Sequence, residues 1–299
     1  MIPFKRILII SDIEGSSLCF SYRASSYMTK EWRLACLGMT EDVRHVVDGL
    51  FEAGVEAVTV KDFHRTGYNI MSERIHPSAR VVSGYKSGPV PGIGNPVRAE
   101  AVMFLGMHAA AGTKGFLPHT LTSRIVRMEV NGKPMSEVEL FSASLAPYGL
   151  RPIFFSGCPV ACRQAEAAIG MIRVYPIQKN MSIQQFDAES WRLGLREAAV
   201  NALQNDSTTI YLPKGPFATV VTMRDGKRIA QKLAKRWGFD HRDNRIFIHA
   251  PDIHTLYQNL IRLCYLTPLT EKTIPFWLFM YGLWGRLGLF WVRRGLNLN

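Results

Sequence analysis

Residues 6–14 read Arg-Ile-Leu-Ile-Ile-Ser-Asp-Ile-Glu, a short apolar run that ends on two carboxylates. Two later stretches have the same form: the run 55–60 leads into Lys61-Asp62-Phe63-His64, and the run 101–106 leads into Met107-His108. Short runs rich in β-branched residues, separated by helical stretches, are typical of buried parallel strands. In open α/β sheets, binding sites form just beyond the carboxyl ends of such strands. The sequence therefore predicts that Asp12, Glu14, His64 and His108 converge at one edge of a sheet.

The segment between the first two runs predicts a helix. Thr40 is placed to cap its amino terminus, Glu41 and Asp42 follow where the helix dipole favours acids, and Gly54 is placed to end it. Because a strand–helix–strand order implies a right-handed crossover, the two strands should be parallel neighbours. We therefore predict an α/β fold in which helices flank a largely parallel sheet.

The rest of the chain predicts further elements and a smaller second α/β region. Beyond the Pro- and Gly-rich loop 86–98, we expect strands at 125–130, 152–156, 208–212, 219–223 and 245–249, and helices at 161–169, 190–203, 224–236 and after Asp252. Asn131-Gly132 predicts a hairpin turn. We divide the chain into a catalytic region 1–180, a second α/β region 181–272 and an aromatic tail 273–299.

The residues at the strand ends are of the types that bind metals. Asp12 and Glu14 are two apart, so on an extended chain both side chains point to the same side. His119 lies in a Gly-bearing loop eleven residues beyond His108, and Glu137 follows the Asn131-Gly132 turn. Mixed carboxylate and imidazole ligands suit zinc, manganese, cobalt or iron, and differ from the all-thiolate set of structural zinc sites. The sequence therefore predicts a metal site.

These segments resemble the motifs of the bacterial D-aminopeptidase (dipeptide transport protein A) family of zinc metallopeptidases. The matching segments, in family order from Ile7 to about Ile169, are Ser11-Asp-Ile-Glu-Gly15, Val60-Lys-Asp-Phe-His64, Leu105-Gly-Met-His108, Gly115-Phe-Leu-Pro-His119 and Asn131-Gly-Lys-Pro-Met-Ser-Glu137. The resemblance implies metal ligands at Asp12, Glu14, His64, His108 and Glu137, a catalytic role for His119, and assembly into large homo-oligomeric rings. Departures from the family pattern fall on Ser16 to Cys19, on the alanines after His108, on 138–141 and on Cys158, so the substrate-facing surroundings should differ.

Five ligands are more than one tetrahedral zinc ion needs, which favours a two-zinc site with Asp12 as the bridging carboxylate, and a single zinc ion is the alternative. We predict metal-dependent hydrolysis of the amide bond next to a free amino terminus, on a short peptide or aminoacyl amide, with His119 as the proton shuttle. One alternative is metal-dependent hydrolysis of another bond, such as a phosphoester. The other is a membrane-associated protein that binds metal without turnover.

The composition limits the possible class, location and partners of the protein. A hydrophobic fraction of 47% is typical of a folded enzyme and excludes a disordered chain. Five cysteines without a disulfide pattern favour the cytoplasm. The net charge is +12, and the basic residues are most concentrated at 224–236. This segment predicts an amphipathic helix whose basic face contacts solvent, an anionic lipid surface or nucleic acid. The absence of any nucleic-acid-binding motif argues against the last of these.

The tail from Ile274 to Val292 is apolar and aromatic, interrupted by Arg286 and followed by Arg293 and Arg294. Nineteen residues approach the length that spans a bilayer. The tail therefore has three possible interpretations: packing within an oligomer, contact with a membrane surface through 274–294, or a membrane span. The central arginine argues against the span.

Overall fold

The structure, a computed structural model, describes residues 2–96 and 98–297. Its strands are β1 (Arg6–Ser11), β2 (Ala57–Asp62), β3 (Arg80–Val82), β4 (Ala101–Met107), β5 (Ile125–Val130), β6 (Lys133–Pro134), β7 (Arg151–Gly157), β8 (Arg173–Pro176), β9 (Phe217–Met223), β10 (Asp240–Arg242) and β11 (Arg245–Ala250). Its helices are α1 (Lys30–Glu52), α2 (Glu137–Leu145), α3 (Pro159–Ile169), α4 (Ala188–Ala202), α5 (Lys227–Trp237), α6 (Ile253–Tyr265), α7 (Pro268–Lys272) and α8 (Ile274–Gly295). Short 3₁₀ turns occupy Ser72–Arg74, Ala146–Tyr148 and Ile183–Gln185.

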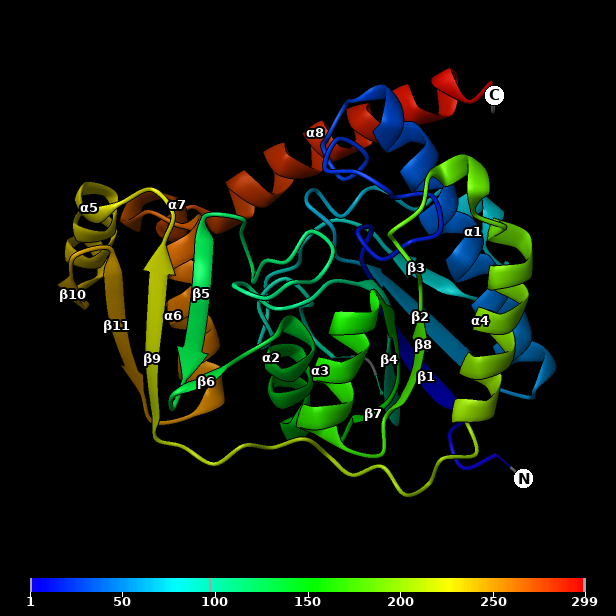
Figure 1. Cartoon of the computed structure of the whole chain (residues 1–299), viewed down its shortest axis with the longest axis horizontal. Coiled ribbons are helices and arrows are strands. Elements are labelled where there is room, and N and C mark those ends of the chain that lie inside the picture. Colours follow the sequence, from blue (N-terminus) through cyan, green and yellow to red (C-terminus); the bar gives the residue numbers. More distant parts are fainter. Residues whose placement is uncertain (1, 97, 298–299) are drawn as a thin grey trace.

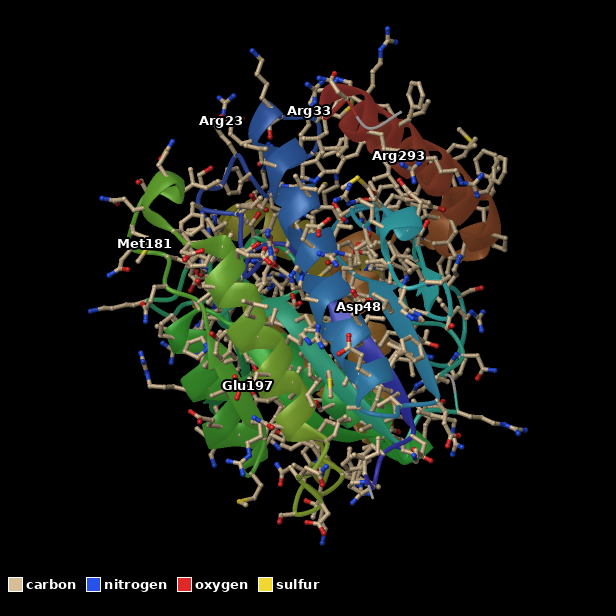
Figure 2. All side chains as sticks on the ribbon, turned by 90° about the vertical axis from the view of Figure 1, so that its right-hand side faces the viewer. Arg23, Arg33, Asp48, Met181, Glu197 and Arg293 are labelled. Carbon is tan, nitrogen blue, oxygen red and sulfur yellow. The ribbon has the colours of Figure 1, made fainter. Side chains whose placement is uncertain are left out.

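The first sheet is parallel and six-stranded, in the order β3-β2-β1-β4-β7-β8. Helices α1 and α4 lie side by side on one face, whereas α2 and α3 cover the other (Figures 1 and 2). Alternate residues of each central strand enter the two cores: Ile7 and Ile9 pack toward α1, and Leu8 and Ile10 toward α2 and α3. The predicted α/β fold with a largely parallel sheet is confirmed.

The second sheet is antiparallel and five-stranded, in the order β10-β11-β9-β5-β6, with α5 and α6 beside it (Figure 1). Its β5–β6 hairpin, which the Asn131-Gly132 turn predicted, comes from the first half of the chain and pairs with β9. The second region therefore draws one hairpin from before residue 180, and the proposed division at 180 and 272 stays a prediction.

One predicted helix start and one predicted strand are wrong. The helix predicted to begin after Thr40 begins at Lys30 instead, capped by Thr29, and Thr40 lies inside it with its hydroxyl donating to the Cys36 carbonyl (2.7 Å). Residues 208–212, predicted as a strand, belong to an extended connection between α4 and β9 that joins neither sheet. The predicted caps Gly54 and Asp252 do lie at helix ends.

The aromatic tail forms one continuous helix, α8, which crosses the molecule from the second region to the amino-terminal half of α1 (Figure 1). Within residues 2–96 and 98–297, none of the helices combines the length and apolarity that crossing a bilayer needs.

Candidate metal centre

Two glycines let the carboxyl ends of β1 and β4 approach closely. Gly106 has a φ of +71°, and a Cβ there would lie 2.2 Å from the Asp12 carbonyl oxygen. A Cβ at Gly15 would lie 2.4 Å from the Met107 carbonyl oxygen. The chain instead forms backbone hydrogen bonds from Asp12 N to Leu105 O (2.8 Å) and from Gly15 N to Gly106 O (2.7 Å). This contact sets Asp12 and Glu14 beside the histidine that follows β4.

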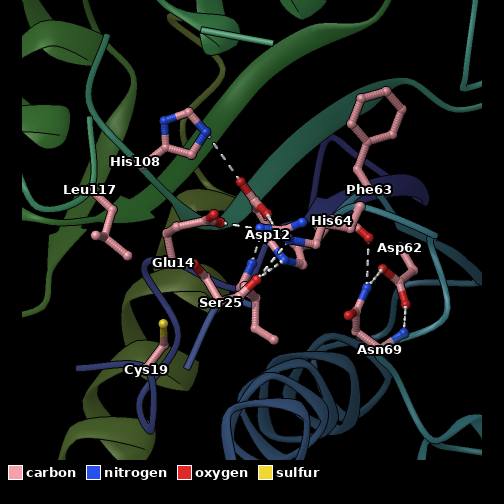
Figure 3. A network of polar contacts seen from close by, with 12 residues as sticks. Asp12, Glu14, Cys19, Ser25, Asp62, Phe63, His64, Asn69, His108 and Leu117 are labelled. Carbon is pink, nitrogen blue, oxygen red and sulfur yellow. Dashed lines mark hydrogen bonds and ion pairs between the residues drawn. The ribbon is translucent and has the colours of Figure 1, made fainter. Parts of the chain in front are cut away.

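The structure brings the predicted side chains together at this edge (Figure 3). His64 Nδ1 lies 3.0 Å from Asp12 Oδ1 and 3.2 Å from Glu14 Oε2. His108 Nε2 lies 3.3 Å from Asp12 Oδ2 and 3.5 Å from Glu137 Oε2. Asp12 therefore directs one carboxylate oxygen to each imidazole, and all five residues are buried.

Glu137 reaches the cluster from the opposite side. Ser136 caps α2 in a capping box with Glu139, so Glu137 stands at the first position of the helix. Its Oε1 accepts a hydrogen bond from the Leu121 amide (2.6 Å), which leaves Oε2 directed toward His108.

His119 completes the group. Its ring stacks on that of His108, with centroids 3.7 Å apart and an interplanar angle of 15°. Ligand-type atoms of His108, His119 and Glu137 lie within 4.8 Å of one another, as do those of Asp12, Glu14 and His108. Unlike the other five residues, His119 is partly exposed.

The three imidazoles share one arrangement. In each ring, one nitrogen lies at hydrogen-bond distance from a backbone carbonyl: His64 Nε2 from Ser25 O (2.9 Å), His108 Nδ1 from Ala109 O (3.1 Å), and His119 Nδ1 from Leu117 O (2.9 Å). Because a carbonyl only accepts, that nitrogen carries the proton. The opposite nitrogen is the one that can act as a ligand once it is deprotonated, an orientation common in metal-binding histidines.

Charge and burial act against each other in this cluster. Burial alone would lower the pKa of His64 and His108, but the surrounding carboxylates, led by Glu14 for His64 and by Glu137 for His108, raise both to about 10. Burial and the charge of Glu14 raise the pKa of Asp12 to about 7. Burial and the charge of His108 lower the pKa of His119. The carboxylates around His64 and His108 therefore favour positive charge at the centre of the cluster.

The donor set fits a metal ion. Glu14 Oε2 and His108 Nε2 are buried and have no hydrogen-bond partner within the described residues, although oppositely charged atoms lie nearby. Buried polar atoms in folded proteins are normally hydrogen-bonded, so two such atoms facing the same cluster need an explanation. A cation bound between them would satisfy both, and neutral imidazole with carboxylate is a ligand set that zinc accepts.

A second group of residues, which the sequence did not identify, holds His64 in place. Asp62 is fully buried and accepts hydrogen bonds from the amides of Asn69 and Ile70, while the Asn69 side chain donates to the His64 carbonyl (2.7 Å). Trp32 Nε1 in turn donates to Asn69 Oδ1 (3.1 Å). Asp62 therefore fixes the loop and takes no direct part in the cluster, although it too stands at a strand end (Figure 3). The contact between His64 and the Ser25 carbonyl could not be predicted, because every residue has a backbone carbonyl and the sequence does not show which one lies near a given side chain.

The loop after Glu14 is anchored by Lys179 and by Asp42. Lys179 Nζ donates to the carbonyls of Ser16 (2.5 Å) and Cys19 (2.7 Å). Asp42 accepts from the Ser17 amide (2.7 Å) and from Arg192 Nε (3.0 Å). Asp42, predicted to serve the helix dipole, instead ties α1 and α4 to this loop.

Comparison with known proteins agrees with this geometry. Residues 5–260 match the model of peptidase family M55, described as D-aminopeptidase, so the chain belongs to that family. The family predicted from the five motifs is thereby confirmed.

Individual relatives extend the comparison. The chain is 28% identical over 173 residues to a D-aminopeptidase of Bacillus subtilis (strain 168), an alignment that covers 56% of this chain and 62% of that relative's length. Among solved structures, it is similar to the Zn-dependent D-aminopeptidase DppA from Bacillus subtilis, a self-compartmentalizing protease, with a TM-score of 0.78. The two chains are 21% identical, and the match covers 86% of this chain and 96% of DppA, which shows a common fold.

Proposed function

We propose that this protein is a zinc-dependent aminopeptidase that cleaves the amide bond following a free amino-terminal residue, with D-residues as its preferred substrates. The observation that carries the proposal is the set of three imidazoles, each held by a backbone carbonyl through one nitrogen, which leaves the other nitrogen as the potential ligand, beside three buried carboxylates. Membership of the D-aminopeptidase family and the zinc dependence of DppA support the choice of reaction and metal.

Asp12 lies at the centre of the proposed ligands. His64 and Glu14 on one side of Asp12, and His108 and Glu137 on the other, would hold zinc together with it, because the Asp12 carboxylate already faces both imidazoles. Bound zinc would supply a Lewis acid that polarises the scissile carbonyl and lowers the pKa of a water molecule.

His119 would move the proton in this reaction. Its Nδ1 is held by the Leu117 carbonyl, so Nε2 is the atom that can accept a proton from the attacking water and pass it to the leaving amine. Its partial exposure leaves the ring accessible to a substrate, whereas the five proposed ligands are buried. Since ligand-type atoms of His119 also lie close to His108 and Glu137, the competing role is that of a sixth ligand.

Substrates would be short peptides or aminoacyl amides, and the protein would act as a homo-oligomer. We propose a ring-type assembly, which the self-compartmentalizing nature of DppA supports. Sedimentation velocity of the purified chain would test it, with a monomer at micromolar concentration as the opposing result.

The reaction is tested by a substrate screen on zinc-loaded protein. Matched D- and L-alanyl anilides, their N-acetylated forms and an aryl phosphate separate the proposed reaction from other hydrolytic reactions. We expect turnover of the D-alanyl anilide alone or foremost, and none after N-acetylation. His254→Ala, on an exposed histidine of α6, is the control that should retain full activity. Preferential turnover of the phosphate, or no turnover at all, would refute the assignment.

A further inference from the structure

Helix α8 is fixed to the body of the protein along one face. Gly285 and Gly288 let it approach closely, since a Cβ at these positions would lie 2.3 Å from Tyr68 and 2.4 Å from Tyr27, respectively. Leu289 and Val292 enter the core shared with α1. Arg293 pairs with Glu73 (2.6 Å), and the Arg33 guanidinium lies 3.5 Å from the Trp291 ring centroid. Figure 2 shows Arg33 and Arg293 beside this contact. The orientation of the outer face is therefore set by packing.

That outer face carries an uninterrupted apolar stripe. Its members recur at helical spacing and are each 38–60% exposed: Phe276, Phe279, Met280, Leu283, Leu287 and Phe290. Trp277 and Trp284 flank the stripe and are 47% and 50% exposed. From first to last the stripe extends about 21 Å at 1.5 Å per residue. Soluble monomers rarely expose a continuous apolar surface of this kind, which indicates a binding face.

The charges on α8 indicate what binds to this face. Residues 274–297 contain three arginines and no acidic residue, and within the described residues neither Arg286 nor Arg294 has an ion-pair partner. Pairing with α8 of a second copy would bring arginines together with no carboxylate on the helix to neutralise them, on a chain whose net charge is already +12. An anionic lipid surface satisfies the arginines and the aromatic stripe at the same time.

We propose that α8 is a membrane-docking helix that lies flat on an anionic bilayer, with the stripe 276–290 in the lipid interface. The helix lies beyond residues 5–260, the part of the chain that matches the family model. The basic helix α5 is not the contact, because its apolar residues pack inward and residues 227–237 include no large exposed hydrophobic side chain.

Substitutions on the outer face test the proposal better than truncation, because removing α8 would also uncover Tyr27, Trp32 and Tyr68. The stripe variant is Leu283→Ser with Leu287→Ser, and the charge variant is Arg286→Gln. Leu193→Ser on α4 is the matched apolar control, since Leu193 is 55% exposed and Leu287 is 60% exposed. Lys232→Gln with Lys235→Gln is the control for the basic face of α5.

Full-length protein is sedimented with vesicles of phosphatidylcholine, alone or with roughly a third of phosphatidylglycerol. We expect binding to the anionic vesicles that weakens with salt. The stripe variant should lose at least about tenfold in affinity and the charge variant about fivefold, with both controls unchanged. Brominated acyl chains should quench tryptophan emission of the bound protein, and Trp277→Phe with Trp284→Phe should remove that quenching, whereas Trp191→Phe should not.

Two results would overturn the proposal. In the first, the stripe variant binds vesicles as tightly as the Leu193→Ser control, but its oligomer dissociates in sedimentation velocity. The stripe would then be a contact surface for a second copy of the chain. The second is that full-length protein binds neither kind of vesicle.

Discussion

Replacing Asn69 by alanine should weaken both the fold and the metal centre, because this buried side chain links three groups behind His64. Its Nδ2 donates to Asp62 Oδ1 (2.9 Å) and to the His64 carbonyl (2.7 Å), and its Oδ1 accepts from Trp32 Nε1 (3.1 Å). Alanine leaves a carboxylate oxygen, a carbonyl and an indole N–H without these partners in a fully buried place. At about 1–3 kcal/mol for each unsatisfied group, with partial relaxation, the free energy of unfolding should fall by about 3–6 kcal/mol. That is a large part of the roughly 5–15 kcal/mol that stabilises a typical domain.

The assay separates stability from metal binding. Urea unfolding is followed in the presence of a chelator, so that bound metal does not add to stability. Zinc affinity is then measured by competition with a chromophoric chelator, where disturbing a group that orients a ligand should cost about 10–100-fold. Asn205→Ala is the matched control, because Asn205 is also buried but its side-chain amide donates, among the described residues, only to the Met171 carbonyl, away from the cluster. Equal zinc affinities for the two variants would refute the role given to Asn69.

Three further predictions concern the centre itself. Gly106→Ala should destabilise the protein by about 3 kcal/mol or more, because an L-residue is strained at a φ of +71° and its Cβ would meet the Asp12 carbonyl. Thermal unfolding measures this loss, and an unchanged melting temperature would contradict the prediction. His119→Ala should keep its zinc and lose turnover by roughly 10²–10⁴-fold, whereas loss of zinc would make His119 a ligand. Zinc affinity should rise with pH across the neutral range, because zinc must displace protons from His64 and His108, whose pKa is raised to about 10 in the metal-free protein. Calorimetry in buffers of different ionisation enthalpy counts the protons released, and a count near zero at neutral pH would contradict this assignment.

The strand-end pattern predicted the first sheet well because it depends on local properties. Apolar runs identify buried strands, and the crossover rule places their carboxyl ends at one edge, so Asp12, Glu14, His64 and His108 could be placed together from the sequence. Glu137 and His119 needed the family motifs, because they arrive from a helix and a loop whose positions no periodicity fixes.

The errors arose where long-range contacts decide the structure. Thr40 followed by Glu41 and Asp42 has the composition of a helix start, yet the two acids pair with Arg74 and Arg192 on distant segments. Residues 208–212 have strand-forming side chains, but no described strand lies beside them to complete a ladder. The joining of the β5–β6 hairpin to the second sheet likewise depends on a pairing with β9 far along the chain.

The most direct test of the metal centre is anomalous X-ray scattering at the zinc edge from crystals of the zinc-loaded protein. We expect one or two peaks enclosed by His64 Nδ1, His108 Nε2 and the carboxylates of Asp12, Glu14 and Glu137, and no peak there in crystals of Asp12→Ala. Zinc found only on surface histidines such as His254, with an empty cluster at the strand ends, would contradict it.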